Sequence, residues 1–181
     1  EIHTHPMKGT IDASLPDAAE RLRTDYKEGC EHNTIVDLMR NDLNRVATDV
    51  QIARLKYLTP LHTSRGDLLQ MSSEIRGQIQ AKYQGALGDL LLELLPAGSI
   101  SGAPKERTVA LIQEAEGRPR GFYTGVCGYF DGASLDSAVL IRFVEEDASG
   151  AHFYRSGGGI TINSVAEDEY RECLQKIYIP Q

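Results

Sequence analysis

The sequence predicts an α+β fold, in which antiparallel sheets carry helices packed on their outer faces. Two observations support this class. Apolar residues recur at helical spacing from about Asp17 to Ala47 and again from about Val165 to Ile177, whereas residues 122–162 contain short strand-forming segments separated by turn residues. Helices and strands that occupy separate stretches of a chain are typical of α+β domains rather than of alternating α/β folds.

The first half of the chain is predicted to begin with a helix. Leu15-Pro16-Asp17 is typical of a turn that enters a helix, whose buried stripe should hold Ile35, Leu38 and Met39, with Gly29 as a candidate break. The next elements are expected in this order: strands at 52–58 and 67–78 with Thr59-Pro60 and Arg65-Gly66 as turns, a helix at 85–95, and a helix from Pro104 to Glu116.

The second half is predicted to form an antiparallel meander after the linker Gly117-Arg118-Pro119-Arg120-Gly121. Its strands are expected at Tyr123–Phe130, Leu135–Val144 and His152–Ile162, joined by the turn sequences Asp131-Gly132 and Asp147-Ala148-Ser149-Gly150.

The composition is that of one globular domain covering residues 1–181, with 41% hydrophobic and 25% charged residues. The net charge of −7 and the lack of a Lys/Arg stripe argue against nucleic acid or an anionic membrane as a partner. The strongest apolar run, Leu90–Leu95, is interrupted by Glu93 and is too short to span a bilayer.

Cysteine usage and the first residue bear on context. Three cysteines without a C-x-x-C pair favour a reducing compartment, by default the cytoplasm. Because the chain begins at Glu1 without an initiator Met, we expect it to be the C-terminal portion of a longer protein.

Lys8, in Thr4-His5-Pro6-Met7-Lys8-Gly9-Thr10, is the first candidate for chemistry. A lysine amine has an ordinary pKa of about 10.4, so it attacks a substrate at neutral pH only when its surroundings lower that value or a base takes its proton. A solvated lysine beside a glycine turn is the alternative.

Two acidic pairs are candidate metal ligands, Glu28 with Glu31 and Glu169 with Glu172. Each spacing places both carboxylates on one helix face. Mg²⁺ accepts few direct carboxylates and keeps several waters, so the two pairs would suit it if their helices converge. The alternative for either pair is a solvated helix face, and Lys176, four residues after Glu172, also fits an ordinary helix salt bridge.

Arg142 and a glycine run are candidate anion-binding groups. Arg142 is predicted to share a strand face with Ala138, Leu140 and Val144, where a guanidinium needs a carboxylate partner from the protein or from a ligand. Gly157-Gly158-Gly159 either offers backbone N–H groups to an anion or forms a plain turn.

Two further motifs have structural alternatives. Gly98–Lys105 is either a ligand-facing loop at a helix N-terminus or a tight connection. Cys127, in Gly125-Val126-Cys127-Gly128-Tyr129, half resembles the nucleophile turn of glutamine amidotransferases, but Tyr129 stands where that turn needs glycine. We therefore predict Cys127 to be a small buried strand residue.

Five motifs appear in the order seen in chorismate-utilising enzymes, and the chain resembles that family over nearly its whole length. They are Pro6-Met7-Lys8-Gly9-Thr10, the segment from Glu31 to Asp42, Gly98–Lys105, Gly157-Gly158-Gly159-Ile160, and Glu169-x-x-Glu172-x-x-x-Lys176. The family includes anthranilate, isochorismate and salicylate synthases and aminodeoxychorismate synthase component I. The Pro-x-Lys-Gly-Thr form resembles the last of these, because anthranilate synthases have alanine in place of the lysine.

The resemblance implies the C-terminal part of the chorismate-binding fold and a reaction in two displacements. Lys8 would attack chorismate at C2 while the C4 hydroxyl leaves, and ammonia would then add at C4 and expel the lysine. The product would be 4-amino-4-deoxychorismate, a precursor of para-aminobenzoate and folate. The ammonia would come from a separate glutamine amidotransferase subunit, since no Cys-His-Glu set is recognisable here.

The resemblance also assigns roles around the substrate. Mg²⁺ would be bound by Glu31 and Glu172, with Glu28 and Glu169 acting directly or through waters. The enolpyruvyl side of chorismate would contact Arg142, Tyr123 and the backbone of Gly157, Gly158 and Gly159, while Thr10 and Lys176 would line the same pocket.

The chain departs from the family pattern in two ways. Gln70-Met71-Ser72-Ser73 stands where relatives often have His-Leu-Val-Ser, which leaves the acid-base assignment open. The family's upstream glutamate, expected to assist the C4 hydroxyl, lies outside this sequence. The alternatives are therefore an anthranilate or isochorismate synthase reaction, or a non-catalytic module that binds chorismate or docks a subunit.

Overall fold

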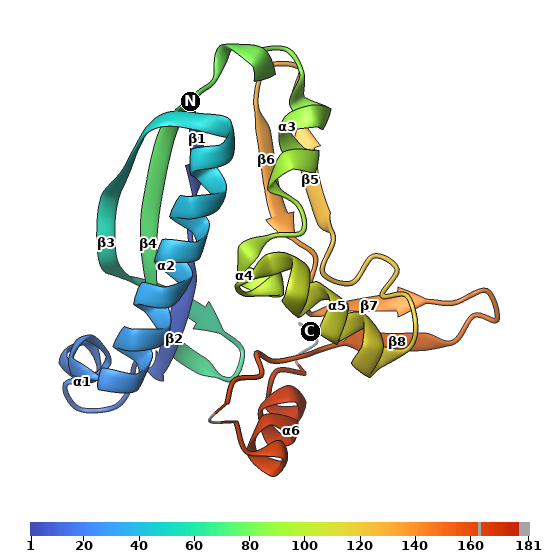
Figure 1. Ribbon diagram of the computed structural model, residues 1–181. Helices are drawn as coiled ribbons and strands as arrows, with labels where there is room; N and C mark the ends of the chain where they lie inside the picture. Colours follow the sequence, from blue (N-terminus) through green and yellow to red (C-terminus); the bar gives the residue numbers. More distant parts are fainter. Residues whose placement is uncertain (163, 178–181) are drawn as a thin grey trace. The chain divides into compact units, whose positions relative to one another are not determined.

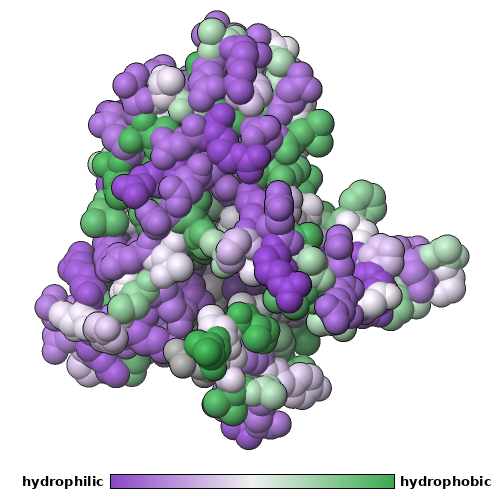
Figure 2. Space-filling view, in the orientation of Figure 1, coloured by the Kyte–Doolittle hydropathy of each residue, from purple (hydrophilic) through white to green (hydrophobic). Residues whose placement is uncertain are grey.

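The computed structural model describes residues 1–162 and 164–177, and the chain divides into two units, Glu1–Ile112 and Gln113–Gln181. The assignment of residues 1–181 to one domain stays a prediction. Within the described ranges, no helix has both the length and the apolar character needed to cross a membrane. Figure 2 shows hydrophilic side chains over much of the visible surface of the first unit.

The first unit contains a four-stranded antiparallel sheet in which the strand that comes last in the sequence pairs with the other three (Figure 1). Its strands are β1 (Ile2–Thr4), β2 (Met7–Asp12), β3 (Ala47–Thr63) and β4 (Gly66–Ile79). Along one edge β4 pairs with β3, whereas β1 and β2 pair one after the other along its opposite edge, with Ile2 facing Gly77 and Asp12 facing Leu68.

Helix α2 (Tyr26–Val46) packs on this sheet and carries the core (Figure 1). Val36 and Leu43 pack against Ile75 of β4, and Val46 packs with Leu90. The other helices of the first half are α1 (Ala18–Thr24), the 3₁₀ turn η1 (Ala81–Tyr83), α3 (Leu87–Leu94), α4 (Gly98–Ser101) and α5 (Lys105–Glu116), which runs across the boundary between the units.

Three local predictions for the first unit are wrong for physical reasons. The helical segment breaks at Asp25 rather than Gly29, because the Asp25 side chain accepts a hydrogen bond from the Glu28 N–H at 2.8 Å and begins α2. The most buried face of α2 holds Val36, Leu43 and Val46, whereas Ile35 and Leu38 are half-buried. Met39 is also half-buried but packs against the cluster of Val36, Leu43 and Ile75, as predicted. Pro60 lies inside β3, which tolerates a residue without an N–H because β3 pairs with β4 on one side only.

The second unit contains two separate hairpins instead of a continuous meander. Strand β5 (Val126–Phe130) pairs with β6 (Leu135–Val139), and β7 (Phe143–Glu146) pairs with β8 (His152–Arg155). The predicted strand 135–144 is interrupted because Arg142 has a φ of 55°, which is outside the extended region. Helix α6 (Ala166–Gln175) follows, and Cys127, predicted to be buried, is exposed on β5.

Candidate active site

Lys8 lies in a β-bulge of the first unit. Met7 faces Ser72 and Thr10 faces Gln70, so Lys8 and Gly9 together face the single residue Met71. Bulges of this kind bend a strand and redirect a side chain. Gly9 has a φ of 96°, and a Cβ there would stand 2.9 Å from Met71 Cε and 3.2 Å from Glu28 Oε2. The bulge therefore requires glycine immediately after the lysine.

Two side chains hold the carbonyl groups of the bulge. His32, completely buried on α2, has its Nδ1 3.1 Å from the Lys8 carbonyl oxygen. Gln70 Nε2 donates to the Gly9 carbonyl at 2.8 Å, and its Oε1 accepts from the Thr10 hydroxyl at 2.9 Å. Gln70 thus uses both ends of its amide to brace the strand that carries Lys8.

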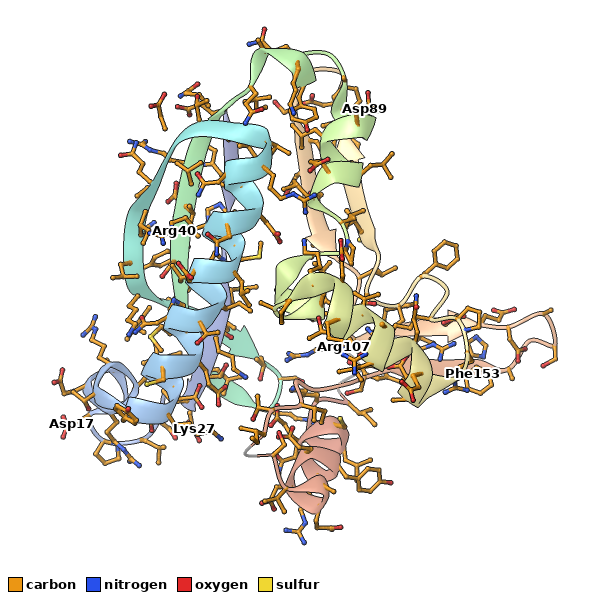
Figure 3. The ribbon with its side chains drawn as sticks, in the orientation of Figure 1. Asp17, Lys27, Arg40, Asp89, Arg107 and Phe153 are labelled. Carbon is orange, nitrogen blue, oxygen red and sulfur yellow. The ribbon has the colours of Figure 1, made fainter. Side chains whose placement is uncertain are left out.

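The amine of Lys8 lies against a predicted metal ligand. Its Nζ is 2.8 Å from Glu31 Oε2, and the two side chains are 41% and 36% exposed. Figure 3 shows Lys27 near the start of α2, from where its Nζ approaches the other Glu31 oxygen at 3.9 Å. The structure therefore brings the candidate nucleophile and one member of the first acidic pair into contact.

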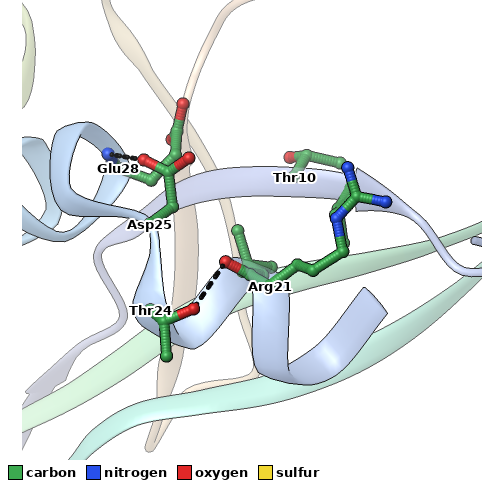
Figure 4. Close-up of a pocket in the computed structure, with 7 residues that line it drawn as sticks. Thr10, Arg21, Thr24, Asp25 and Glu28 are labelled. Atoms are coloured by element: carbon green, nitrogen blue, oxygen red, sulfur yellow. Dashed lines mark hydrogen bonds between the residues drawn. The ribbon is translucent and has the colours of Figure 1, made fainter. Parts of the chain in front are cut away.

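Glu28, the other member of that pair, lies in a partly buried, acidic environment that Lys8 and Lys27 offset only in part. Burial raises the pKa of its carboxyl, and the nearby negative charge of Glu31 raises it further. Figure 4 shows Glu28 at the wall of a hollow of about 420 Å³. The other lining residues are Thr10, Ile11, Arg21, Leu22, Thr24 and Asp25.

Several predicted site residues come together in the second unit. A Cβ on Gly157 would collide with the Tyr123 hydroxyl, so this glycine allows the phenol to approach the backbone. Lys176 Nζ donates to the Gly157 carbonyl at 3.3 Å and pairs with Glu172 Oε1 at 2.5 Å. A Cβ on Gly158 would stand 3.4 Å from Glu169 Oε2. Burial raises the pKa of Tyr123, which keeps the phenol protonated as a hydrogen-bond donor.

One predicted placement in the second unit is wrong, and one glycine of the predicted anion-binding run is open. Arg142 is exposed in the segment between β6 and β7 and does not share a buried strand face with Ala138, Leu140 and Val144. Gly159 is open, because a Cβ added there would have no atom of the described residues within 4 Å apart from its chain neighbours.

The acidic pairs lie in different units, Glu28 and Glu31 on α2 and Glu169 and Glu172 on α6. Among residues 1–162 and 164–177, no group of three or more His, Cys, Asp or Glu side chains is arranged to hold a metal. The chemistry of the donors nevertheless fits Mg²⁺, which uses one or two carboxylates with waters and substrate. A cation beside Glu28 would offset the raised pKa of its carboxyl.

The Gly98–Lys105 segment is a tight connection. Asp42, at the end of the Glu31–Asp42 motif, accepts from the Gly98 N–H at 2.7 Å and from Lys105 Nζ at 2.8 Å. Two of the five motifs are therefore joined by one buried carboxylate.

His32 and Ser73 were given no role by the sequence patterns. The available signal was the spacing of His32 with Val36 and Leu43, which placed a histidine on the apolar face of a helix.

The chain belongs to the chorismate binding enzyme family, whose model matches residues 1–180. It is 57% identical over 180 residues to an uncharacterized PabA-like protein of Pasteurella multocida, an alignment that covers 99% of this chain and 55% of that protein. It is 34% identical over 186 residues to aminodeoxychorismate synthase component 1 of Escherichia coli, covering 98% of this chain and 39% of the relative.

A solved structure supports the same family. The crystal structure of anthranilate synthase component I from Streptococcus pneumoniae has a TM-score of 0.80 and 31% identity, over 97% of this chain and 38% of that chain. The predicted fold class is confirmed, and the chain matches the C-terminal part of the chorismate-binding fold. The chain spans about half the length of the first relative and less of the other two, and its similarity to the two kinds of synthase is comparable.

Proposed function

We propose that this chain forms the lysine-bearing part of an aminodeoxychorismate synthase component I, which converts chorismate and ammonia to 4-amino-4-deoxychorismate. Overall similarity does not separate this reaction from anthranilate synthesis, so the proposal depends on one residue. The observation that carries it is Lys8, an amine presented by a glycine-dependent bulge 2.8 Å from the Glu31 carboxylate.

The proposed reaction uses the Lys8 amine twice. Nζ forms a bond to C2 of chorismate while both ring double bonds shift, from C1=C2 and C5=C6 to C1=C6 and C4=C5, and the C4–O bond breaks. The departing hydroxyl takes up the proton that the amine loses and leaves as water. Ammonia then forms a bond to C4, both double bonds shift back, the C2–N bond breaks to regenerate Lys8, and the new ammonium loses a proton. Before the first step the amine must lose a proton, and Glu31 is the carboxylate in contact with it.

Other residues would bind and orient the substrate. Glu31 and Glu172 would hold Mg²⁺, with Glu28 and Glu169 contributing directly or through waters, and the ion would supply positive charge for the ring carboxylate. Tyr123 is suited to donate to the enolpyruvyl carboxylate because the raised pKa keeps its phenol protonated. Arg142 and the backbone of Gly157, Gly158 and Gly159 would bind the same side, with Thr10 and Lys176 lining the pocket.

The ammonia would come from a glutamine amidotransferase subunit, and the proposed product would serve para-aminobenzoate and folate synthesis. The cytoplasm remains the expected compartment, and neither nucleic acid nor a membrane is a proposed partner.

Product analysis tests the reaction. The full-length protein is incubated with chorismate, MgCl₂ and ammonium chloride. The products are then separated by chromatography and identified by mass spectrometry. We expect 4-amino-4-deoxychorismate. The solved anthranilate synthase structure makes anthranilate the main competing product, and tight Mg²⁺-dependent binding of chorismate without turnover would favour a binding module instead.

A further inference from the structure

The bulge that presents Lys8 is connected to the core by a chain of hydrogen bonds that starts at His32. Lys8 and Gly9 face one residue of β4, so the backbone here leaves the regular pairing of the sheet. His32 Nδ1 lies 3.1 Å from the Lys8 carbonyl oxygen, and His32 Nε2 lies 2.7 Å from the Ser73 hydroxyl. His32 is 0% exposed, so its ring is shielded from water, and its contact with Ser73 is buried.

The partners of His32 select one tautomer. A carbonyl oxygen only accepts hydrogen bonds, so Nδ1 must carry the hydrogen that is donated to Lys8. In this neutral tautomer Nε2 carries no hydrogen and accepts from the Ser73 hydroxyl, whose oxygen in turn accepts from the Lys56 backbone N–H at 2.9 Å. Two backbone groups, one on β2 and one on β3, thereby fix the orientation of the imidazole.

We propose that His32 is a positioning residue for Lys8, an inference that rests on the proposed function. His32 holds the main chain of Lys8, while the preceding residue of α2, Glu31, contacts its amine at 2.8 Å. Consecutive residues of one helix thus fix both ends of the lysine. Holding a reacting group in place matters because a displacement of about 1 Å can cost about 100-fold in rate.

The first test reads the tautomer in the unaltered protein. With ¹⁵N-histidine labelling, the nitrogen spectrum of His32 should show a hydrogen-bearing Nδ1 and a bare Nε2, with the signal assigned by its loss in a His32→Asn variant. A hydrogen on Nε2 alone would overturn the proposal, because such a ring cannot donate to the Lys8 carbonyl. This measurement does not require catalysis. If His32→Asn does not fold, the other four histidines can be assigned through their own variants, which identifies the His32 signal by elimination.

The second test uses two matched substitutions. In His32→Asn the amide nitrogen can take the place of Nδ1 and keep the bond to Lys8, whereas in His32→Gln the longer amide reaches the place of Nε2 and keeps only the bond to Ser73. Both remove the ring and retain one hydrogen bond. We expect His32→Gln to lower kcat about 10-fold or more with little change in KM, and His32→Asn to lose much less. If both variants lost kcat equally, in proportion to the decrease in their melting temperatures, His32 would have only a packing role.

Chemical labelling separates failure of this inference from failure of the proposed function. Trinitrobenzenesulfonate labelling at one pH, measured on the Lys8 peptide relative to Lys82, should increase about two- to fivefold in His32→Gln as the contact with Glu31 loosens. In His32→Asn it should stay near the wild-type value. If the wild-type protein makes no aminodeoxychorismate but this contrast appears, the positioning role holds and only the reaction is wrong. Identical labelling in all three proteins contradicts the positioning role.

Discussion

The presentation of Lys8 depends most directly on Gly9, because this residue combines a φ of 96° with close neighbours on two sides. Its missing side chain lets Met71 and Glu28 approach the strand together. The lysine and the acidic pair are thus brought near each other by a residue that carries no chemistry itself.

Replacing Gly9 by alanine should therefore destabilise the protein in two ways, through backbone strain at the positive φ and through steric clashes with Met71 and Glu28. Gly66 is a matched control, since its φ of 126° is also unfavourable for alanine but no atom of the described residues lies within 4 Å of an added Cβ. We expect Gly9→Ala to lower the free energy of unfolding by about 1–3 kcal/mol more than Gly66→Ala, as measured by urea denaturation. Similar losses for the two variants would show that Met71 and Glu28 do not crowd the bulge.

Glu28 makes a prediction about pH. Its pKa is raised from the ordinary 4.5, first by burial and then by the charge of Glu31, so the folded protein binds its proton more tightly than the unfolded chain. The resulting stabilisation is complete below about pH 4.5 and is lost as the pH rises through the raised pKa. Without Mg²⁺, the unfolding free energy of wild type relative to Glu28→Gln should fall across that range. Parallel curves for the two proteins would contradict the assigned burial of this carboxyl.

At the scale of elements, Asp42 connects α2, α4 and the start of α5. Its side chain is 10% exposed and accepts from the Gly98 N–H and from Lys105, whose side chain is 21% exposed. Removing one member of a shielded pair leaves the other without compensation, so the connection should be sensitive to substitution.

Asp42→Ala should lower the free energy of unfolding by about 3 kcal/mol. Asp37 provides the control, because it pairs with Arg40 at 2.7 Å on the exposed side of the same helix, and Asp37→Ala should cost less than about 1 kcal/mol. A double-mutant cycle with Lys105→Met would measure the pair itself. If Asp42→Ala cost no more than Asp37→Ala, the connection would not depend on this carboxylate.

The sequence predicted the helices and strands that have a local hydrophobic periodicity. It missed the elements that form only through pairing with residues far away in the chain. The long helix and the strand β4 followed from periodicity. In contrast, β1 and β2 are short, β2 follows Pro6 and contains Gly9, and both depend on pairing with β4. The break at Arg142 depends on a positive φ that the apolar pattern of residues 135–144 conceals. The contact between Lys8 and Glu31 joins two motifs that the sequence singled out, whereas the contact of His32 required the distance to a carbonyl 24 residues away.

At the scale of the whole molecule, part of the net negative charge is concentrated in glutamate pairs on two helices. Two helices, α2 and α6, each carry a glutamate pair, and each unit places a lysine against one of them, Lys8 on Glu31 and Lys176 on Glu172. Each glutamate pair is thus partly neutralised by a lysine of its own unit.

If Glu31 is a ligand of Mg²⁺, binding should stabilise the protein through this carboxylate. We expect MgCl₂ to raise the melting temperature of the wild type at constant ionic strength, and Glu31→Gln to remove most of that rise. Glu167→Gln, which alters an exposed glutamate of α6 that pairs with Arg171, is the control and should keep the rise. An undiminished rise in Glu31→Gln would contradict the assignment of Glu31 as a ligand.

The most direct test of the central claim is a search for the covalent intermediate on Lys8. The full-length protein is mixed with chorismate and Mg²⁺ in the absence of ammonia, quenched, digested and analysed by peptide mass spectrometry. The account predicts that the peptide containing Lys8 gains the mass of chorismate less one water, that added ammonium removes this mass as product appears, and that the Lys27 peptide stays unmodified. Formation of aminodeoxychorismate at the wild-type rate by Lys8→Ala, with no adduct in the wild type, would contradict it.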